Sequence, residues 1–326
     1  MSKNYKCDIN TIRKSPIVSV VDNYDKLYYP EDTITKSSRY THWIDSETIL
    51  RTHTTSGIPN LLKELESEDS IYLLPGIVYR RDVIDRCHVG EPHQMDIWHI
   101  CKNKVNREDL LKLVSIIIES ILPGVEWRYS ETTHYYTING IEVEVLINGE
   151  WLEILECGEL HPQLIKDCGK NENEWSGLAL GIGLDRAVMV KKNISDIRVL
   201  RSSNSKIATQ MLNLELYKEV SSQPKVVTDL SICVNKDIDS EMLGDKIRMI
   251  MINEIELIEE IIIKSETSYE SLPEHVQERL GMDSSMKNIL ISITLRALDR
   301  TLTKEECNDM TRYLYKEIHE GNKGYV

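Results

Sequence analysis

The sequence predicts an α+β protein in which an antiparallel sheet flanked by helices is followed by a smaller domain with a split β-α-β arrangement. Two apolar segments, 141–147 and 150–157, are joined by Asn148-Gly149, a pair typical of a β-hairpin turn. Hairpins join neighbouring antiparallel strands, so the main sheet is expected to be antiparallel. From residue 226 onward, short segments follow the order strand, helix, strand, strand, helix.

The first two strands come after a polar, weakly patterned stretch at 1–45. Residues 71–81 form an apolar strand that Pro75-Gly76 interrupts, and 93–100 form a second strand. The residues between them, 83–92, carry charges and a glycine, which suit an exposed loop.

Two helices are expected in the first part. Residues 109–122 place apolar side chains at helical spacing and end at Pro123-Gly124. A second helical stretch covers 202–220. We predict a catalytic domain over 1–212, a linker over 213–223 and a small domain over 224–326.

The small domain is predicted to contain strands at 226–234, 255–263 and 289–295, with a helix at 240–252. A last helix opens with Thr303 and Glu306, which have capping-box spacing.

Composition bounds the function. The chain has 326 residues and a net charge of 39 − 53 = −14, so whole-molecule electrostatics repel nucleic acid and any RNA must bind at a local basic groove. No apolar run reaches the roughly 18 residues of a membrane span, and no secretory signal is evident, so we expect a cytoplasmic protein. Seven scattered cysteines indicate reduced thiols.

Two segments carry side chains suited to phosphate. Arg80 ends a predicted strand beside a basic loop and is placed to grip phosphate, although a surface strand with salt bridges has the same pattern. Residues 177–189 read as an apolar strand, a glycine-rich turn and a helix that begins near Arg186. That pattern also fits a close-packed joint between a strand and a helix.

Taken together, the ordered motifs resemble the class II aminoacyl-tRNA synthetases, specifically the single-chain phenylalanyl-tRNA synthetase family. The resemblance covers most of 30–212, and 224–326 resemble that family's ferredoxin-fold anticodon-binding domain. The motifs are Leu50–Thr55, Tyr79–Asp82, His88, His93-Gln94, Trp151–Leu155, Cys157-Gly158, His161-Pro162 and Gly181–Arg186.

This resemblance implies that ATP and an amino acid form an aminoacyl-adenylate, from which the acyl group passes to tRNA, here a phenylalanine tRNA. It implies that Arg80 holds the α-phosphate, Arg186 the γ-phosphate, and that His88 lies over the ATP tail. Glu153 is the expected Mg²⁺ ligand, and Glu144 is the second candidate.

The resemblance also implies an amino-acid site, whose residues depart from the family pattern. Its expected members are His53, Thr55, Gln94, Asp96, Tyr135, Tyr136 and Ala179. Asp96 and Ile97 stand where the family has Glu and Gly, and Glu156 stands where it commonly has Gly. The segment His134–Thr137 replaces a Phe-Pro-Phe-Thr loop. The first class II motif is short here, so we expect a monomer or a weak dimer.

These departures leave two alternatives: a paralogue that activates another amino acid for tRNA or another acceptor, and a silent homologue that binds tRNA or amino acid. Histidines and cysteines that fall within fifteen positions are also candidate zinc ligands, but the resemblance implies that they are strand and loop residues. They are Cys87, His88, His93, His99 and Cys101.

The chain contains no Phe, against 15 Tyr and 5 Trp. One hypothesis is that the protein must be made when phenylalanyl-tRNA is scarce; deliberate removal by design is the alternative. Unchanged yield under phenylalanine limitation after restoring Phe codons would exclude the hypothesis.

Overall fold

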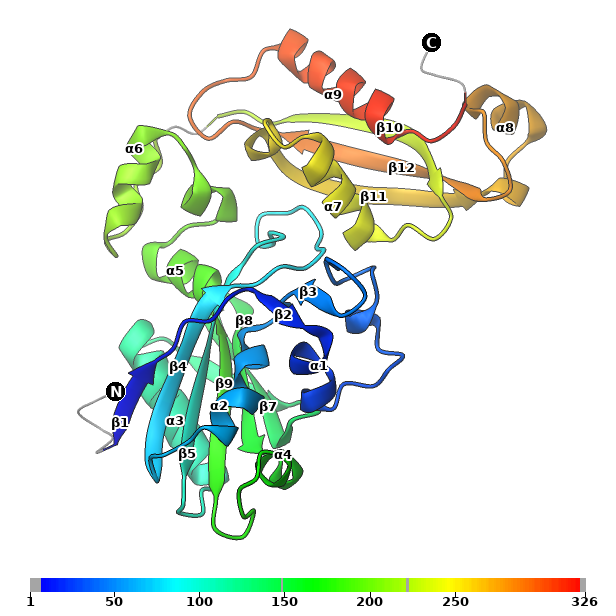
Figure 1. The fold of residues 1–326 in the computed structure, drawn as a ribbon. Coiled ribbons are helices and arrows are strands. Elements are labelled where there is room, and N and C mark those ends of the chain that lie inside the picture. The colour runs from blue at the N-terminus through cyan, green and yellow to red at the C-terminus, as the bar shows by residue number, and fades with distance from the viewer. Residues whose placement is uncertain (1–6, 148, 221–222, 323–326) are drawn as a thin grey trace. The chain divides into compact units, whose positions relative to one another are not determined.

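The computed structural model describes residues 7–147, 149–220 and 223–322, and the chain forms two compact units (Figure 1). The first unit comprises Met1–Arg80 and Glu91–Asn193, and the second comprises Arg81–Gly90 and Ile194–Val326, as far as these ranges are described. Among the described residues, none of the helices combines the length and hydropathy that a membrane crossing requires.

Within the described residues, the first unit is built on a seven-stranded sheet. Strand β1 is parallel to β4, and every other neighbouring pair is antiparallel, which confirms the antiparallel main sheet. In spatial order the strands are β1 (Asp8–Thr11), β4 (Asp69–Ile77), β5 (His93–Cys101), β9 (Ser176–Gly183), β8 (Glu150–Leu160), β7 (Thr137–Ile147) and β6 (Trp127–Glu131).

Helices cover both faces of this sheet (Figure 1). On one face lies α3 (Arg107–Ile121), the predicted helix at 109–122, which begins with a capping box formed by Asn106 and Asp109. Its buried residues pack against the apolar side chains of β7, β8 and β9. The opposite face packs against α2 (Ile58–Lys63) and α4 (Pro162–Asp167).

Strand β4 does not break at Pro75-Gly76, contrary to the prediction. Pro75 pairs with Met95 of β5, and the strand continues to Ile77. The Val78 N–H donates to the Pro92 carbonyl, next to β5, and the Leu73 carbonyl accepts from the Ile12 N–H, next to β1. Backbone polar groups of successive residues in a strand point to opposite sides, so the nitrogen of Pro75, two residues after Leu73, points toward β1. Because β1 ends opposite Leu73, the missing N–H of proline interrupts no ladder bond.

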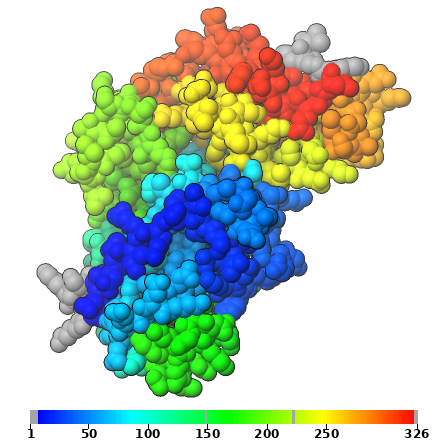
Figure 2. Space-filling view, in the orientation of Figure 1, coloured from blue at the N-terminus to red at the C-terminus, as the bar shows by residue number. Residues whose placement is uncertain are grey.

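From residue 7 onward, the weakly patterned N-terminal stretch forms a layer of the first unit, and Figure 2 shows it in blue on the surface of that unit. Strands β2 (Ile17–Ser19) and β3 (Thr48–Leu50) pair here, and α1 (Val20–Asn23) follows β2. Tyr24 and Leu27 are fully buried, and the Tyr24 hydroxyl is 2.5 Å from the Thr35 carbonyl oxygen. The layer therefore has a buried apolar cluster of its own, formed by Val20, Tyr24 and Ile49.

In the second unit, β12 (Met286–Leu295) lies between β10 (Val226–Asn235) and β11 (Ile258–Ser268) and is antiparallel to both. Strands β10 and β11, joined through α7 (Ser240–Ile250), therefore run parallel. Helices α7 and α9 (Lys304–Ile318) contribute to one apolar core with β10 and β12. The predicted capping box of Thr303 and Glu306 is confirmed, whereas α8 (Glu274–Leu280), between β11 and β12, was not predicted.

The loop predicted at 83–92 is a loop, but its first part is held rather than exposed. Arg81 forms an ion pair with Asp245 of α7, and Arg248 donates to backbone carbonyls of the segment. Ile84 is buried in the apolar core of the second unit. Residues 81–84 are consequently anchored to α7 and to the core of the second unit.

The helix predicted over 202–220 is wrong. Only two short elements form in this range, α6 (Ser205–Ala208) and η5 (Thr209–Leu212), after η4 (Ile197–Arg201) has ended, and the described residues 213–220 contain no helix. Leu212, Leu214 and Leu216 alternate at a spacing of two and are largely exposed, so no apolar helical face is available to stabilise a longer helix.

Candidate functional site

The predicted amino-acid-site residues of β5 and β9 lie on the sheet face opposite α3. Side chains two residues apart on a strand share a face, which places Gln94 and Asp96 together with Trp98. In the register, Asp96 pairs with Gly181 and Trp98 pairs with Ala179. The glycine leaves this face of β9 open beside Asp96.

Asp96 is a fully engaged hydrogen-bond acceptor. Its two carboxylate oxygens accept from the hydroxyls of Thr54 and Thr55, each at 2.6 Å, and one also accepts from the Trp98 indole at 3.0 Å. Burial raises the pKa of Asp96 above its usual value, although these hydrogen bonds act in the opposite direction. Two predicted site residues, Thr55 and Asp96, are thereby in direct contact.

Trp98 was not singled out in the sequence. Its indole is fully buried and stacks on the ring of Tyr136, with centroids 6.0 Å apart. Tyr136 in turn lies beside His134, also at 6.0 Å. The alternation of β5 was the signal that could have found Trp98, since it comes two residues after Asp96.

His53 lies in an aromatic group supplied by the N-terminal layer. Its ring stacks on Tyr29 at 5.7 Å and meets Tyr24 edge-on at 6.2 Å. Tyr29 also contacts Tyr135, at 4.9 Å, which joins this group to a second predicted site residue. Burial, followed by the positive charge of Arg80, lowers the pKa of His53 to about 4, so the ring is neutral near pH 7.

The segment that carries His53 is fixed by Arg51, a residue of the Leu50–Thr55 motif to which sequence reasoning gave no role. The buried Arg51 guanidinium donates to the carbonyl oxygens of Ile77, at 2.9 Å, and Lys14, at 3.3 Å. A Cβ at Gly76 would come within 1.8 Å of that guanidinium, so any larger residue there would force the guanidinium to move away from these carbonyl oxygens. Residues 51–55 are thus tied to the end of β4.

Arg80 follows the end of β4 and donates to the hydroxyl of Tyr40 at 3.1 Å. Its charge lowers the pKa of His53 and also that of Glu156, where the larger cause is the hydrogen bond with His134. The distance from His134 Nε2 to the Glu156 carboxylate is 3.0 Å. The positive charge of Arg80 therefore affects both His53 and Glu156.

Arg186 and Glu153 meet although they are 33 positions apart. Arg186 lies in the first turn of α5 (Leu184–Lys192), and its guanidinium is 3.3 Å from the carbonyl oxygen of Glu153 and 3.4 Å from its carboxylate. The neighbouring Asp185 accepts from the backbone N–H of His93 at 2.9 Å, which holds the start of α5 against β5.

A row of carboxylates follows β7 and β8. The register shifts between Val143 and Glu144, where Ile154 is the extra residue of a β-bulge. This bulge lets Glu153 and Glu156, three positions apart, pair with Glu144 and Glu142 on the same face.

The row suits a cation. Burial raises the pKa of Glu142, and so does the negative charge of the three other carboxylates. Arg128 neutralises Glu144 at 2.7 Å, and Arg186 approaches Glu153. Since Mg²⁺ prefers carboxylate oxygens, this donor set fits the predicted ion.

His88 belongs to the second unit, where its Nδ1 lies 2.8 Å from the Asp85 carboxylate. Its role over the ATP tail stays a prediction. The alternative zinc site considered from the sequence is not formed by the two histidines of the first unit. His93 and His99 lie at opposite ends of β5 and contact different acids, Asp185 and Asp69.

Comparisons with known proteins identify the family of this chain. The model of the tRNA synthetases class II core domain (F) matches residues 5–211. The chloroplastic/mitochondrial phenylalanine–tRNA ligase of Arabidopsis thaliana is 29% identical over 94% of this chain and 70% of its own length. The mitochondrial phenylalanine–tRNA ligase of Dictyostelium discoideum is 30% identical over 61% of this chain, and a phenylalanine–tRNA ligase alpha subunit of Histophilus somni is 33% identical over 54%. This chain spans 50% and 53% of the length of those two relatives.

Proposed function

The chain belongs to the class II tRNA synthetase family of the phenylalanine type, and from this membership we propose that it activates an amino acid with ATP and transfers it to a tRNA. The observation that carries the proposal is the contact between Arg186 and Glu153, residues expected at the terminal phosphate and at its metal ion. Phosphate-binding and metal-binding groups that meet in this way are what a bent triphosphate requires.

In the proposed reaction, the amino-acid carboxylate attacks the α-phosphorus and pyrophosphate leaves. Arg80 binds the α-phosphate and Arg186 the γ-phosphate, so that charge developing on the phosphoryl oxygens meets preorganised donors. Neutral His53 adds no competing charge beside Arg80. Gln94 is available to orient the amino acid, since its Oε1 has no hydrogen-bond partner among the described residues.

Glu153 and Glu144 would hold the metal, with Glu142 beside them. When bound, Mg²⁺ supplies positive charge that neutralises the leaving pyrophosphate. The protein's own part is to keep the carboxylates on one face of β7 and β8, which the bulge at Ile154 achieves.

Pyrophosphate exchange into ATP tests the proposal across the twenty amino acids. We expect exchange that depends on one amino acid, phenylalanine for the leading assignment, and a loss of at least about 100-fold in Arg186→Ala. The matched control is Arg107→Ala, because Arg107 begins α3 and pairs with Glu131 away from the carboxylate row. If none of the amino acids supports exchange, the proposed activity is excluded, and the remaining alternative is a catalytically silent homologue that binds tRNA or amino acid.

A second candidate is activation of a different amino acid, which one observation favours. The Glu156 carboxylate and His134 form a hydrogen bond at the positions where the family resemblance implies glycine and an aromatic ring. Asp96, which replaces a longer acid, has both oxygens occupied by protein donors. If the pocket has diverged, Glu156→Gly raises exchange with phenylalanine and lowers exchange with the native amino acid; if it has not, phenylalanine supports exchange in the unaltered chain.

For the acceptor step we propose that the second unit is a ferredoxin-like domain that binds the tRNA anticodon. The order β10-β12-β11 with helices α7 and α9 packed into one core supports this assignment. Charging of a phenylalanine tRNA transcript tests the step: a transcript with an altered anticodon should lose aminoacylation while pyrophosphate exchange persists. Equal charging of both transcripts would exclude the anticodon role.

A further inference from the structure

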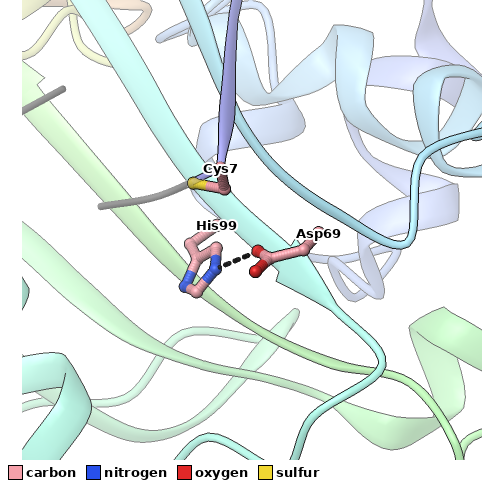
Figure 3. A group of neighbouring side chains, drawn as sticks. All are labelled: Cys7, Asp69 and His99. Carbon is pink, nitrogen blue, oxygen red and sulfur yellow. Dashed lines mark hydrogen bonds and ion pairs between the residues drawn. The ribbon is translucent and has the colours of Figure 1, made fainter.

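The sheet of the first unit brings three potential metal ligands together away from the carboxylate row. Cys7 immediately precedes β1, Asp69 begins β4, and His99 lies near the end of β5 (Figure 3). One ligand atom from each residue lies within 4.8 Å of the other two, and His99 Nε2 is 2.8 Å from the Asp69 carboxylate.

Strand register explains why these residues meet. Asp8 pairs with Ser70 in the parallel β1–β4 ladder, so the preceding residues, Cys7 and Asp69, also lie side by side. On the other edge of β4, Asp69 pairs with Cys101 of β5, and His99, two residues before Cys101, shares its face. The group is therefore built by three neighbouring strands and not by one flexible loop.

The donor set is a thiol sulfur, an imidazole nitrogen and a carboxylate oxygen, which zinc accepts in one tetrahedral site. Zinc bond lengths of about 2.0–2.3 Å place tetrahedral ligands roughly 3.3–3.6 Å apart. Reaching that spacing from the present arrangement requires side-chain shifts on the order of 1 Å. We propose that Cys7, Asp69 and His99 bind Zn²⁺, with solvent completing the coordination.

Binding exchanges protons in a defined way. The Cys7 thiol releases its proton to solvent and binds as thiolate. The proton that His99 Nε2 donates to the Asp69 carboxylate in the metal-free protein moves to Nδ1 through solvent, so that Nε2 binds the ion through its lone pair. Without a cation, burial and the Asp69 charge raise the pKa of Cys7, which keeps the thiol protonated. A divalent ion reverses this effect because it favours the thiolate.

Zinc at this site would hold the edge strand β1 on the sheet. Strand β1 is four residues long and mostly exposed, so it has little apolar burial to hold it on β4. Zinc shared by Cys7, Asp69 and His99 links the start of β1 to two inner strands. Amide hydrogen exchange in β1 should therefore slow when zinc is added.

Zinc titration of the metal-free, reduced full-length protein tests the site, with a chromogenic chelator as competitor. We expect one equivalent bound with a dissociation constant below about 1 µM. Because loss of an outer-shell partner costs about 10–100-fold in affinity, loss of a ligand in Cys7→Ser or His99→Gln should cost at least about 100-fold. Cys87→Ser, an exposed cysteine of the second unit, is the matched control and should bind as the unaltered chain does.

Cobalt gives a second readout that does not depend on enzyme activity. Co²⁺ at this site should show a thiolate-to-cobalt charge-transfer band that Cys7→Ser abolishes. His99 is buried, so its variant is prone to unfold. Cys7→Ser, at a half-buried position, is therefore the decisive variant once circular dichroism has confirmed that it is folded. Zinc affinity unchanged in Cys7→Ser, or affinity weaker than about 1 µM in the unaltered chain, overturns the proposal.

Discussion

His53 should remain uncharged far below the pH at which an ordinary histidine titrates. Burial and Arg80 lower its pKa from 6.5 to about 4. As the pH falls below 6.5, the unfolded chain takes up a proton at this position and the folded chain does not, so stability is lost as the pH falls toward 4. The difference of 6.5 − 4 = 2.5 corresponds to about 3 kcal/mol at about 1.4 kcal/mol per unit.

Two measurements check this titration. The free energy of unfolding, measured with urea, should fall more between pH 7 and pH 4.5 in the unaltered chain than in His53→Gln, which has no proton to gain. The control His275→Gln, at an exposed position of α8, should show the same pH dependence as the unaltered chain. NMR titration of the ring protons reports the pKa directly. A midpoint for His53 near 6.5, or identical pH profiles for the unaltered chain and His53→Gln, would refute the burial argument.

Three further substitutions test the packing by urea unfolding of the affected unit. Gly76→Ala should cost about 2–4 kcal/mol because its Cβ displaces the anchored guanidinium of Arg51; a cost below about 0.5 kcal/mol would contradict the close contact. Trp98→Phe should cost about 1–3 kcal/mol, since Asp96 loses a buried donor, and an unchanged midpoint would show that this hydrogen bond contributes nothing. Thr303→Ala should cost about 1 kcal/mol in the second unit, and equal stability would mean that the capping box is unimportant there.

Local periodicity was sufficient where one face of an element is buried. The helix around Leu110 and Leu113 and the strand from His93 were predicted within a few residues, because burial imposes the spacing that the sequence displays. The stretch at 202–220 failed for the converse reason: its leucines are exposed, so their presence carried no information about a packed helix.

The candidate site was predicted in part. Thr55, Asp96 and Arg186 came from motifs of the family, and the structure places the first two in contact. Tyr29 and Trp98 escaped because their roles depend on register and on chain segments distant in sequence. Motifs identify the side chains that meet a ligand more readily than those that position them.

A crystal structure with ATP, Mg²⁺ and the unreactive analogue phenylalaninol tests the central claim most directly. The account predicts a bent triphosphate with its α-phosphate on Arg80 and its γ-phosphate on Arg186. ATP bound elsewhere, or a triphosphate that touches neither guanidinium, would contradict it.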